Sequence, residues 1–261
     1  MKAKPAAAAK LSWAQVHAFR LERHHLTQRA PKKDLARVVG EIGGVQAQVM
    51  SAAELQVGVR VDCKVADVRD ALWKRKTLAK TWLMRGTLHL VPAADLPLFT
   101  AAMGAFGIRN TNAWLKWMQI TEAELTELID AIGSALDGRA LTREELIAKV
   151  GKGRSERIQA AMKSGWGGVL KPVARKGLLC FGPSRGQSVT FVSPQRWLGS
   201  WRQVDPDAAL TEVARRYLRA YGPATKSDFA RWWGAWPGVG NRAWAGLVGE
   251  LVPVSIDGHP A

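Results

Sequence analysis

Residues 78–91 read Leu-Ala-Lys-Thr-Trp-Leu-Met-Arg-Gly-Thr-Leu-His-Leu-Val, and this stretch decides the fold that we expect. Its two halves, 78–84 and 87–91, are rich in residues that favour β-strands. Between them, Arg85-Gly86 is a Gly-containing pair of the kind that closes a β-hairpin. Segments with apolar residues at helical spacing precede the hairpin. Helices followed by a hairpin are typical of a winged-helix unit.

Three helices are expected before this hairpin. Ser12 is a suitable N-cap for a helix over residues 13–25, and Pro31 opens a second helix at Lys32. Gly43-Gly44 can adopt the left-handed conformation that ends the second helix. A third amphipathic helix covers residues 68–74, with Leu72 and Trp73 facing inward.

The same order recurs twice downstream. The second unit has capping boxes at Thr121 with Glu124 and Thr142 with Glu145, a basic helix over 166–176, and strands over 178–181 and 188–192 around the loop 182–187. The third unit has helices over 208–221, 229–233 and around 241–250, and a strand over 251–256. Asp257-Gly258 should begin a hairpin, but no return strand follows, so we expect a truncated unit.

The sequence therefore predicts a mainly α protein with small β-hairpins, an α+β fold of three tandem winged-helix (helix-turn-helix) units. We expect a disordered basic tail over 1–10, followed by units over 11–110, 111–200 and 201–261. Turn-forming and polar residues indicate linkers near 104–112 and 194–207.

The composition indicates a polyanionic partner. The 261 residues are 47% hydrophobic, and 38 Lys and Arg against 22 Asp and Glu give a formal charge of +16. Such a balance is typical of proteins that bind nucleic acid, although an anionic membrane or no special partner would also fit.

Neither Cys63 nor Cys180 has metal-ligand spacing, so we expect reduced thiols, no metal and no cofactor. Without a signal peptide or a spanning segment, we expect a cytoplasmic protein associated with the nucleoid.

The segment Val45-Gln46-Ala47-Gln48-Val49 alternates apolar and amide side chains directly after the helix-ending glycines. In an extended segment, residues i and i+2 lie on the same face, so Gln46 and Gln48 should converge, whereas in a helix they would point apart. From spacing alone, a strand with two ordinary solvent-facing amides is the favoured interpretation, because a lone Gln-x-Gln pattern is a weak motif.

Several further side chains occupy places from which DNA phosphates are usually reached, on predicted wings and on the basic helix. His89 can either contact the DNA or pack within its hairpin, and Trp166 is the one tryptophan that we expect at the DNA rather than in the core. The expected DNA-binding residues are Lys80, Arg85, His89, Trp166, Lys171, Arg175, Lys176 and Arg185.

The segment 44–48, the hairpin 82–91 and the winged-helix layout together resemble the AlkZ-like winged-helix DNA glycosylases, from about Leu11 to the end of the chain. The resemblance implies excision of alkylated purines, including bases joined in interstrand crosslinks, by a Gln-apolar-Gln motif. Gln46 and Gln48 fall on its two catalytic glutamines. Gln48, where a related branch has Asp, places the chain nearer the crosslink-unhooking branch. Family members continue beyond the third wing, where this sequence ends.

Amides suit this chemistry because an N7-alkylguanine or N3-alkyladenine already carries positive charge and leaves without an acid. A carboxamide has no useful basicity, so the two glutamines should position the water. We expect a monofunctional glycosylase, a monomer acting on double-stranded DNA with alkylated or crosslinked purines. The alternative is a winged-helix transcription regulator that binds DNA without catalysis. Whether the damaged base is flipped stays open.

Overall fold

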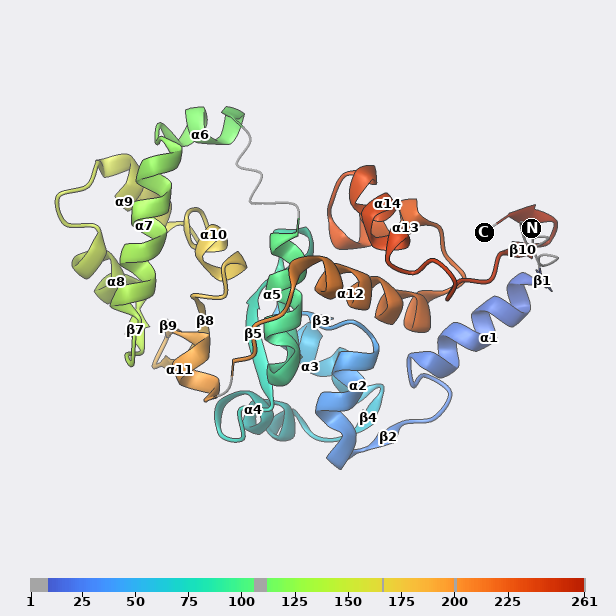
Figure 1. Ribbon diagram of the computed structural model, residues 1–261. Helices are drawn as coiled ribbons and strands as arrows, with labels where there is room; N and C mark the ends of the chain where they lie inside the picture. The colour runs from blue at the N-terminus through green and yellow to red at the C-terminus, as the bar shows by residue number, and fades with distance from the viewer. Residues whose placement is uncertain (1–8, 106–111, 166, 200, 261) are drawn as a thin grey trace.

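The computed structural model describes residues 9–105, 112–165, 167–199 and 201–260. This part of the chain is mainly helical and forms four small sheets, in agreement with the predicted α+β class (Figure 1). Within the described ranges, every helix is too short or too polar to span a lipid bilayer. Cys63 and Cys180 are free thiols, and burial raises the pKa of Cys180 to about 12.

The first part of the chain builds a three-stranded antiparallel sheet with the order β3-β6-β5. The strands of this sheet are β3 (Val45–Gln46), β5 (Leu78–Trp82) and β6 (Leu88–Pro92). Its helices are α1 (Trp13–Arg23), α2 (Leu35–Glu41), α3 (Met50–Gly58), α4 (Val65–Trp73) and α5 (Leu96–Gly104). Two short strands, β2 (Ala30–Pro31) and β4 (Val61–Asp62), pair in parallel.

The predicted hairpin is confirmed, and so are several helix starts. The connection is longer than the predicted two-residue turn, because residues 83–87 separate the strands and Met84–Gly86 form a 3-10 turn in which Arg85 and Gly86 have positive φ angles. Ser12 caps α1 through a capping box with Gln15. The second helix begins later than predicted, because residues 32–34 form a 3-10 turn before α2. The third helix begins earlier, at Val65, where the Asp67 carboxylate accepts the backbone N–H of Lys64.

Helix α3 was not predicted. Its apolar residues surround the helix instead of forming one stripe, since Ala53 and Val57 are buried while Leu55 and Val59 are exposed. A pattern without a preferred face gives no helical signal.

The second part repeats this arrangement with a sheet of order β7-β9-β8, in which a short strand again pairs with the second strand of a hairpin. The strands are β7 (Leu141–Thr142), β8 (Cys180–Arg185) and β9 (Ser188–Val192). The helices are α6 (Asn112–Met118), α7 (Glu122–Ala135), α8 (Arg143–Val150), α9 (Glu156–Lys163), α10 (Leu170–Arg175) and α11 (Pro194–Leu198).

Both capping boxes of this part are present and start α7 and α8 as predicted. The predicted basic helix is shorter than expected, because Gly167 and Gly168 have positive φ angles and α10 starts only at Leu170. Strand β8 runs through most of the predicted loop 182–187. Helix α11 lies within the predicted linker 194–207, and residues 106–111 of the other predicted linker lie outside the described residues.

The third part consists of α12 (Pro206–Tyr221), α13 (Lys226–Trp233), α14 (Pro237–Ala245), and a sheet of order β1-β10-β11. Its strands are β1 (Ala9–Leu11), β10 (Val254–Ile256) and β11 (His259–Pro260). Two expectations are therefore wrong. Ala9 and Lys10 are not in a disordered tail, because they pair in parallel with β10, and a short return strand does follow Asp257-Gly258. Pairing between segments so distant in sequence leaves no local signal.

The β5–β6 hairpin contributes side chains to three hydrophobic clusters. Leu78 and Leu90 pack with α2, α3 and α4, while Leu83 and Met84 pack with α5, α12 and α13. Trp82 belongs to the cluster of the second part, with its ring centroid 4.9 Å from that of Phe181. In Figure 1 the hairpin accordingly lies between the helices at the left and those at the right.

The packing of Trp82 in the core of the second part predicts a large loss of stability when its side chain, which is 2% exposed, is truncated. Trp82→Ala should lower the free energy of unfolding by about 3–5 kcal/mol, because burial is lost and a cavity remains. Urea denaturation measures the change. Trp117, which is 66% exposed, provides the control, and its replacement by Ala should change stability by less than about 0.5 kcal/mol. Equal losses for the two variants would contradict this account of the core.

Candidate functional site

The two glutamines lie on an extended segment, as predicted. Helix α2 ends at Glu41, and Gly43 and Gly44 have φ angles of +75° and +95° before β3 begins. The alternation is also confirmed, because Val45 and Ala47 are buried whereas Gln46 and Gln48 are exposed. The ladder to β6 continues past Gln46, since the N–H of Ala47 donates to the Leu88 carbonyl at 2.7 Å. Both amides are therefore exposed beside the β3–β6 ladder, with Gln46 at the end of β3 and Gln48 at the bend that follows.

The side chain of Gln48 is tied to the hairpin. Its Oε1 accepts from the backbone N–H of Leu88 over 3.4 Å, at the end of the β3–β6 ladder. With the oxygen end of the carboxamide engaged in this way, its NH2 end is left to face outward.

The backbone of Gln46 is connected to α3 and Arg60. The Nε2 of Gln56 donates to the Gln46 carbonyl at 3.5 Å, and the guanidinium of Arg60 donates to the Gln56 carbonyl at 2.8 Å. Burial lowers the pKa of Arg60, and its Nε has no hydrogen-bond partner in the described part of the chain. The sequence analysis did not identify Gln56 or Arg60, because a spacing of four residues indicates proximity only when the segment is known to be helical.

Two of the expected DNA-binding cations gather beside the hairpin turn. A Cβ added to Gly86 would lie 3.8 Å from both the Lys171 Nζ and an NH2 of Arg175. Burial lowers the pKa of Lys171, and the charge of Arg175 lowers it further. Burial also lowers the pKa of Arg175, whose buried Nε has no partner among the described residues. Lys176 follows directly at the end of α10 and is exposed.

The other expected cations are engaged within the protein. The guanidinium of Arg85 donates to the Trp232 carbonyl at 2.5 Å, so it holds the hairpin turn against α13. Arg185 forms an ion pair with Glu145. Lys80 is half-buried on β5, with its Nζ 5.5 Å from the centre of the Phe181 ring, and burial lowers its pKa. Trp166 lies outside the described residues.

His89 is a core residue of the hairpin, which is the second of its two expected roles. Its side chain is 2% exposed, and its Nδ1 lies 3.0 Å from the Thr87 carbonyl, to which it donates. Burial lowers the pKa of His89 to about 4. A buried, neutral imidazole is poorly suited to bind a surface phosphate, so the structure gives no support to the expected DNA contact.

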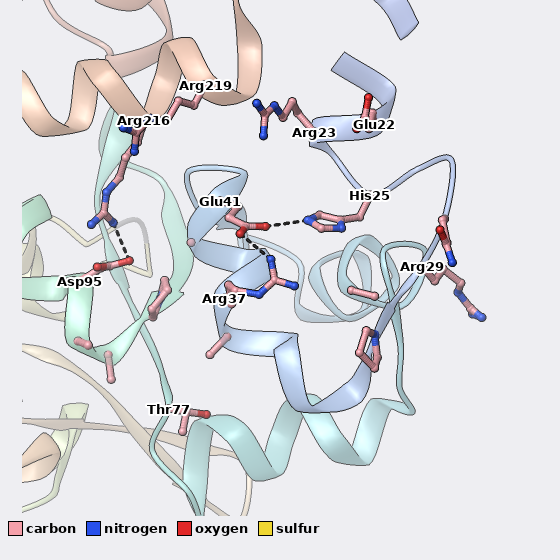
Figure 2. A pocket seen from close by; sticks show the side chains of 18 of the residues that line it. Glu22, Arg23, His25, Arg29, Arg37, Glu41, Thr77, Asp95, Arg216 and Arg219 are labelled. Carbon is pink, nitrogen blue, oxygen red and sulfur yellow. Dashed lines mark hydrogen bonds and ion pairs between the residues drawn. The ribbon is translucent and has the colours of Figure 1, made fainter. Parts of the chain in front are cut away.

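A large cavity lies elsewhere, between α1, α2 and α12, with a volume of about 1130 Å³ (Figure 2). Two of its acids are paired: Figure 2 shows His25 and Arg37 pointing at Glu41, and Arg216 pointing at Asp95. A second, more apolar cavity of about 690 Å³ lies between α1 and residues 250–254. Neither cavity is lined by Gln46 or Gln48, and both glutamines are exposed. In the described part of the chain, His, Cys, Asp and Glu form no group that would hold a metal ion.

The low pKa of His89 predicts a pH dependence of stability. Unfolded His89 takes up a proton near its ordinary pKa of about 6.5, whereas the folded residue does so only near pH 4, so stability is present above about 6.5 and is lost as the pH falls toward 4. The loss should reach about 3 kcal/mol. Urea denaturation at pH 7 and pH 4.5 should show a smaller fall for His89→Asn than for the unmodified chain. Parallel pH profiles for the two proteins would contradict the assignment.

The chain is similar to known proteins along nearly its whole length. The family model described as "DNA glycosylase AlkZ-like" matches residues 39–261, a range that includes both glutamines and the hairpin. A curated relative, the interstrand DNA cross-link repair glycosylase of Streptomyces sahachiroi, is 39% identical over 273 residues, covering 97% of this chain and 69% of the relative.

The solved structure of Streptomyces sahachiroi DNA glycosylase AlkZ superposes with a TM-score of 0.86 at 35% sequence identity, again over 97% of this chain and 69% of that one. Similarity of this extent covers all three parts of the chain and the segment with the two glutamines. The chain therefore belongs to the AlkZ-like family of DNA glycosylases.

Proposed function

We propose that this protein repairs DNA by hydrolysing the N-glycosidic bond of purines alkylated at N7 or N3, with Gln46 and Gln48 holding the attacking water. The observation that carries the proposal is the pair of exposed amides at the end of β3 and at the bend after it, next to the hairpin whose turn Lys171 and Arg175 flank. Family membership supports the glycosylase activity.

The chemistry requires little proton transfer. Alkylation leaves a positive charge on the purine, so the C1′–N bond breaks with its electron pair going to the base, which departs neutral. Water attacks C1′, its proton passes to solvent, and an abasic site remains. The two carboxamides contribute by orienting the water and by placing a carbonyl dipole near the developing positive charge on the sugar. Because no step forms a Schiff base, we propose a monofunctional enzyme.

We also propose that crosslinked purines are substrates. The relative from Streptomyces sahachiroi is named for interstrand cross-link repair. A crosslinked base is tethered to the opposite strand and cannot enter a tight pocket. The exposed position of Gln46 and Gln48, outside both cavities, suits such a substrate.

The two matching arrangements of helices, short strand and hairpin support our inference that the first two parts are winged-helix units, and we assign the third part, α12–α14 with its terminal sheet, to the same class. Three units in one chain favour a monomer bound around a single lesion in double-stranded DNA. We place this activity in the cytoplasm, where bacterial chromosomal DNA is found.

Removing either amide should abolish excision and leave binding intact. With duplex DNA containing N7-methylguanine, Gln46→Ala and Gln48→Ala should each lower the single-turnover rate by about 100-fold or more, because the water is no longer oriented. Release of the base is measured by chromatography, and DNA affinity by fluorescence anisotropy. Gln203→Ala, at an exposed glutamine before α12, serves as the control and should excise normally.

An unchanged rate in the double variant Gln46→Ala/Gln48→Ala would refute the catalytic assignment. The product should be an abasic site whose strand breaks only after alkali treatment. The alternative function, a regulator without catalysis, would appear as one strong palindromic motif in genomic footprinting, together with no base release by the unmodified chain.

Lys171 and Arg175 should contribute to affinity without reading sequence. Replacing either by Ala should weaken binding equally on unrelated duplexes and reduce the slope of log affinity against log salt by about one, because one phosphate contact is lost. Anisotropy titrations between about 50 and 200 mM salt measure the slope. Lys33→Ala, at an exposed lysine outside this site, should leave the slope nearly unchanged. A slope for Lys171→Ala equal to that of the control would argue against the proposed contact.

A further inference from the structure

The register of the central sheet places His89 directly opposite Gln46. Strands β3 and β6 are antiparallel, with Val45 facing Leu90 and Gln46 facing His89. The bond from the Ala47 N–H to the Leu88 carbonyl makes the adjacent pair a hydrogen-bonded one. In an antiparallel ladder the next pair is then non-hydrogen-bonded, which is where facing side chains approach most closely. His89 and Gln46 therefore project from the same face as close neighbours.

The hydrogen bond of His89 determines which ring nitrogen accepts. Nδ1 carries the proton, because it donates to the Thr87 carbonyl at 3.0 Å. In a neutral imidazole the other nitrogen, Nε2, then has a free lone pair and acts only as an acceptor. The ring is buried and the nearby charge of Arg85 opposes its protonation, so both conditions keep it neutral.

We propose that His89 is a positioning residue for Gln46: its Nε2 accepts from the Gln46 carboxamide NH2 when DNA covers the site, which turns the Gln46 oxygen toward the attacking water. This inference rests on the proposed glycosylase function. A carboxamide has a donor end and an acceptor end, and an acceptor beside it selects which end faces the substrate.

The same logic makes the two glutamines complementary. Gln48 has its oxygen held by the Leu88 N–H, so its NH2 end faces outward. Gln46, with its NH2 end held by His89, presents its oxygen. A water between them donates one hydrogen to Gln46 and accepts one from Gln48, and its remaining lone pair is directed at C1′. Two identical side chains thus acquire different roles from their neighbours on β6.

Two substitutions of His89 separate this role from simple packing. Asparagine keeps a donor near the Nδ1 position but has no atom near Nε2, whereas glutamine places an amide oxygen near Nε2. His89→Asn should lower the single-turnover rate on N7-methylguanine DNA by about 10-fold with unchanged DNA affinity, and His89→Gln should return to within about 3-fold of the unmodified chain. Equal excision by His89→Asn and the unmodified chain would overturn the proposal.

A double-mutant cycle with Gln46→Ala tests whether His89 acts through Gln46. In that background, adding His89→Asn should cause no further loss, because the group that it positions is already absent. A second loss of the same size would show that His89 only supports the hairpin, and would overturn the proposal. Absence of excision by the unmodified chain is a different result, since it refutes the proposed function itself.

A spectroscopic measurement on the unmodified chain removes dependence on how the variants fold. Two-bond ¹H–¹⁵N correlation spectra should show His89 protonated at Nδ1 and unprotonated at Nε2. The Nε2 resonance should shift when duplex DNA with a non-hydrolysable abasic-site analogue is added, and Gln46→Ala should remove that shift. A proton on Nε2, or a shift that persists in Gln46→Ala, would overturn the proposal.

Discussion

The β5–β6 hairpin has to bury apolar side chains toward three groups of helices, and the rest of the structure depends on this constraint. Leu78 and Leu90 pack on one side, Leu83 and Met84 on another, and Trp82 enters the core of the second part. A two-stranded hairpin has little stability alone, so it is held by these contacts. The short strand β3 pairs with β6, so the hairpin also fixes β3. Gln46 and Gln48 therefore have a rigid support although they lie on the surface.

The basic side chains fall into two groups, those in ion pairs within the protein and those beside the hairpin turn. Many arginines form ion pairs within the protein, such as the half-buried pair of Arg216 with Asp95 and the exposed pair of Arg37 with Glu41, and exposed pairs add little to stability. Lys171 and Arg175 instead lie together beside the hairpin turn, partly buried, where burial and the charge of Arg175 lower the pKa of Lys171. Positive charge beside the hairpin turn thus comes from the second part of the chain, with whose core Trp82 packs.

Local patterns were reliable where the interaction that stabilises an element lies within a few residues. The capping boxes at Thr121 and Thr142, the hairpin around Arg85-Gly86 and the glycine-terminated α2 were all predicted correctly. Predictions failed where distant segments decide the structure. The β1–β10 pairing joins residues 9–11 to residues 254–256, and α3, which packs against α4, β3 and β4, has apolar residues on both its buried and its exposed sides.

The sequence alone determined that an extended Gln-Ala-Gln segment follows a helix, that a hairpin comes later, and that the protein is strongly basic, because alternation, turn residues and composition are local properties. Only the tertiary structure decided what these features do together. It buried His89 opposite Gln46, anchored Gln48 to Leu88, and withdrew Arg85 and Arg185 into internal contacts. The physical reason is that a side chain's hydrogen-bond partner, exposure and pKa depend on neighbours across strands and between domains, and these neighbours are distant in the sequence.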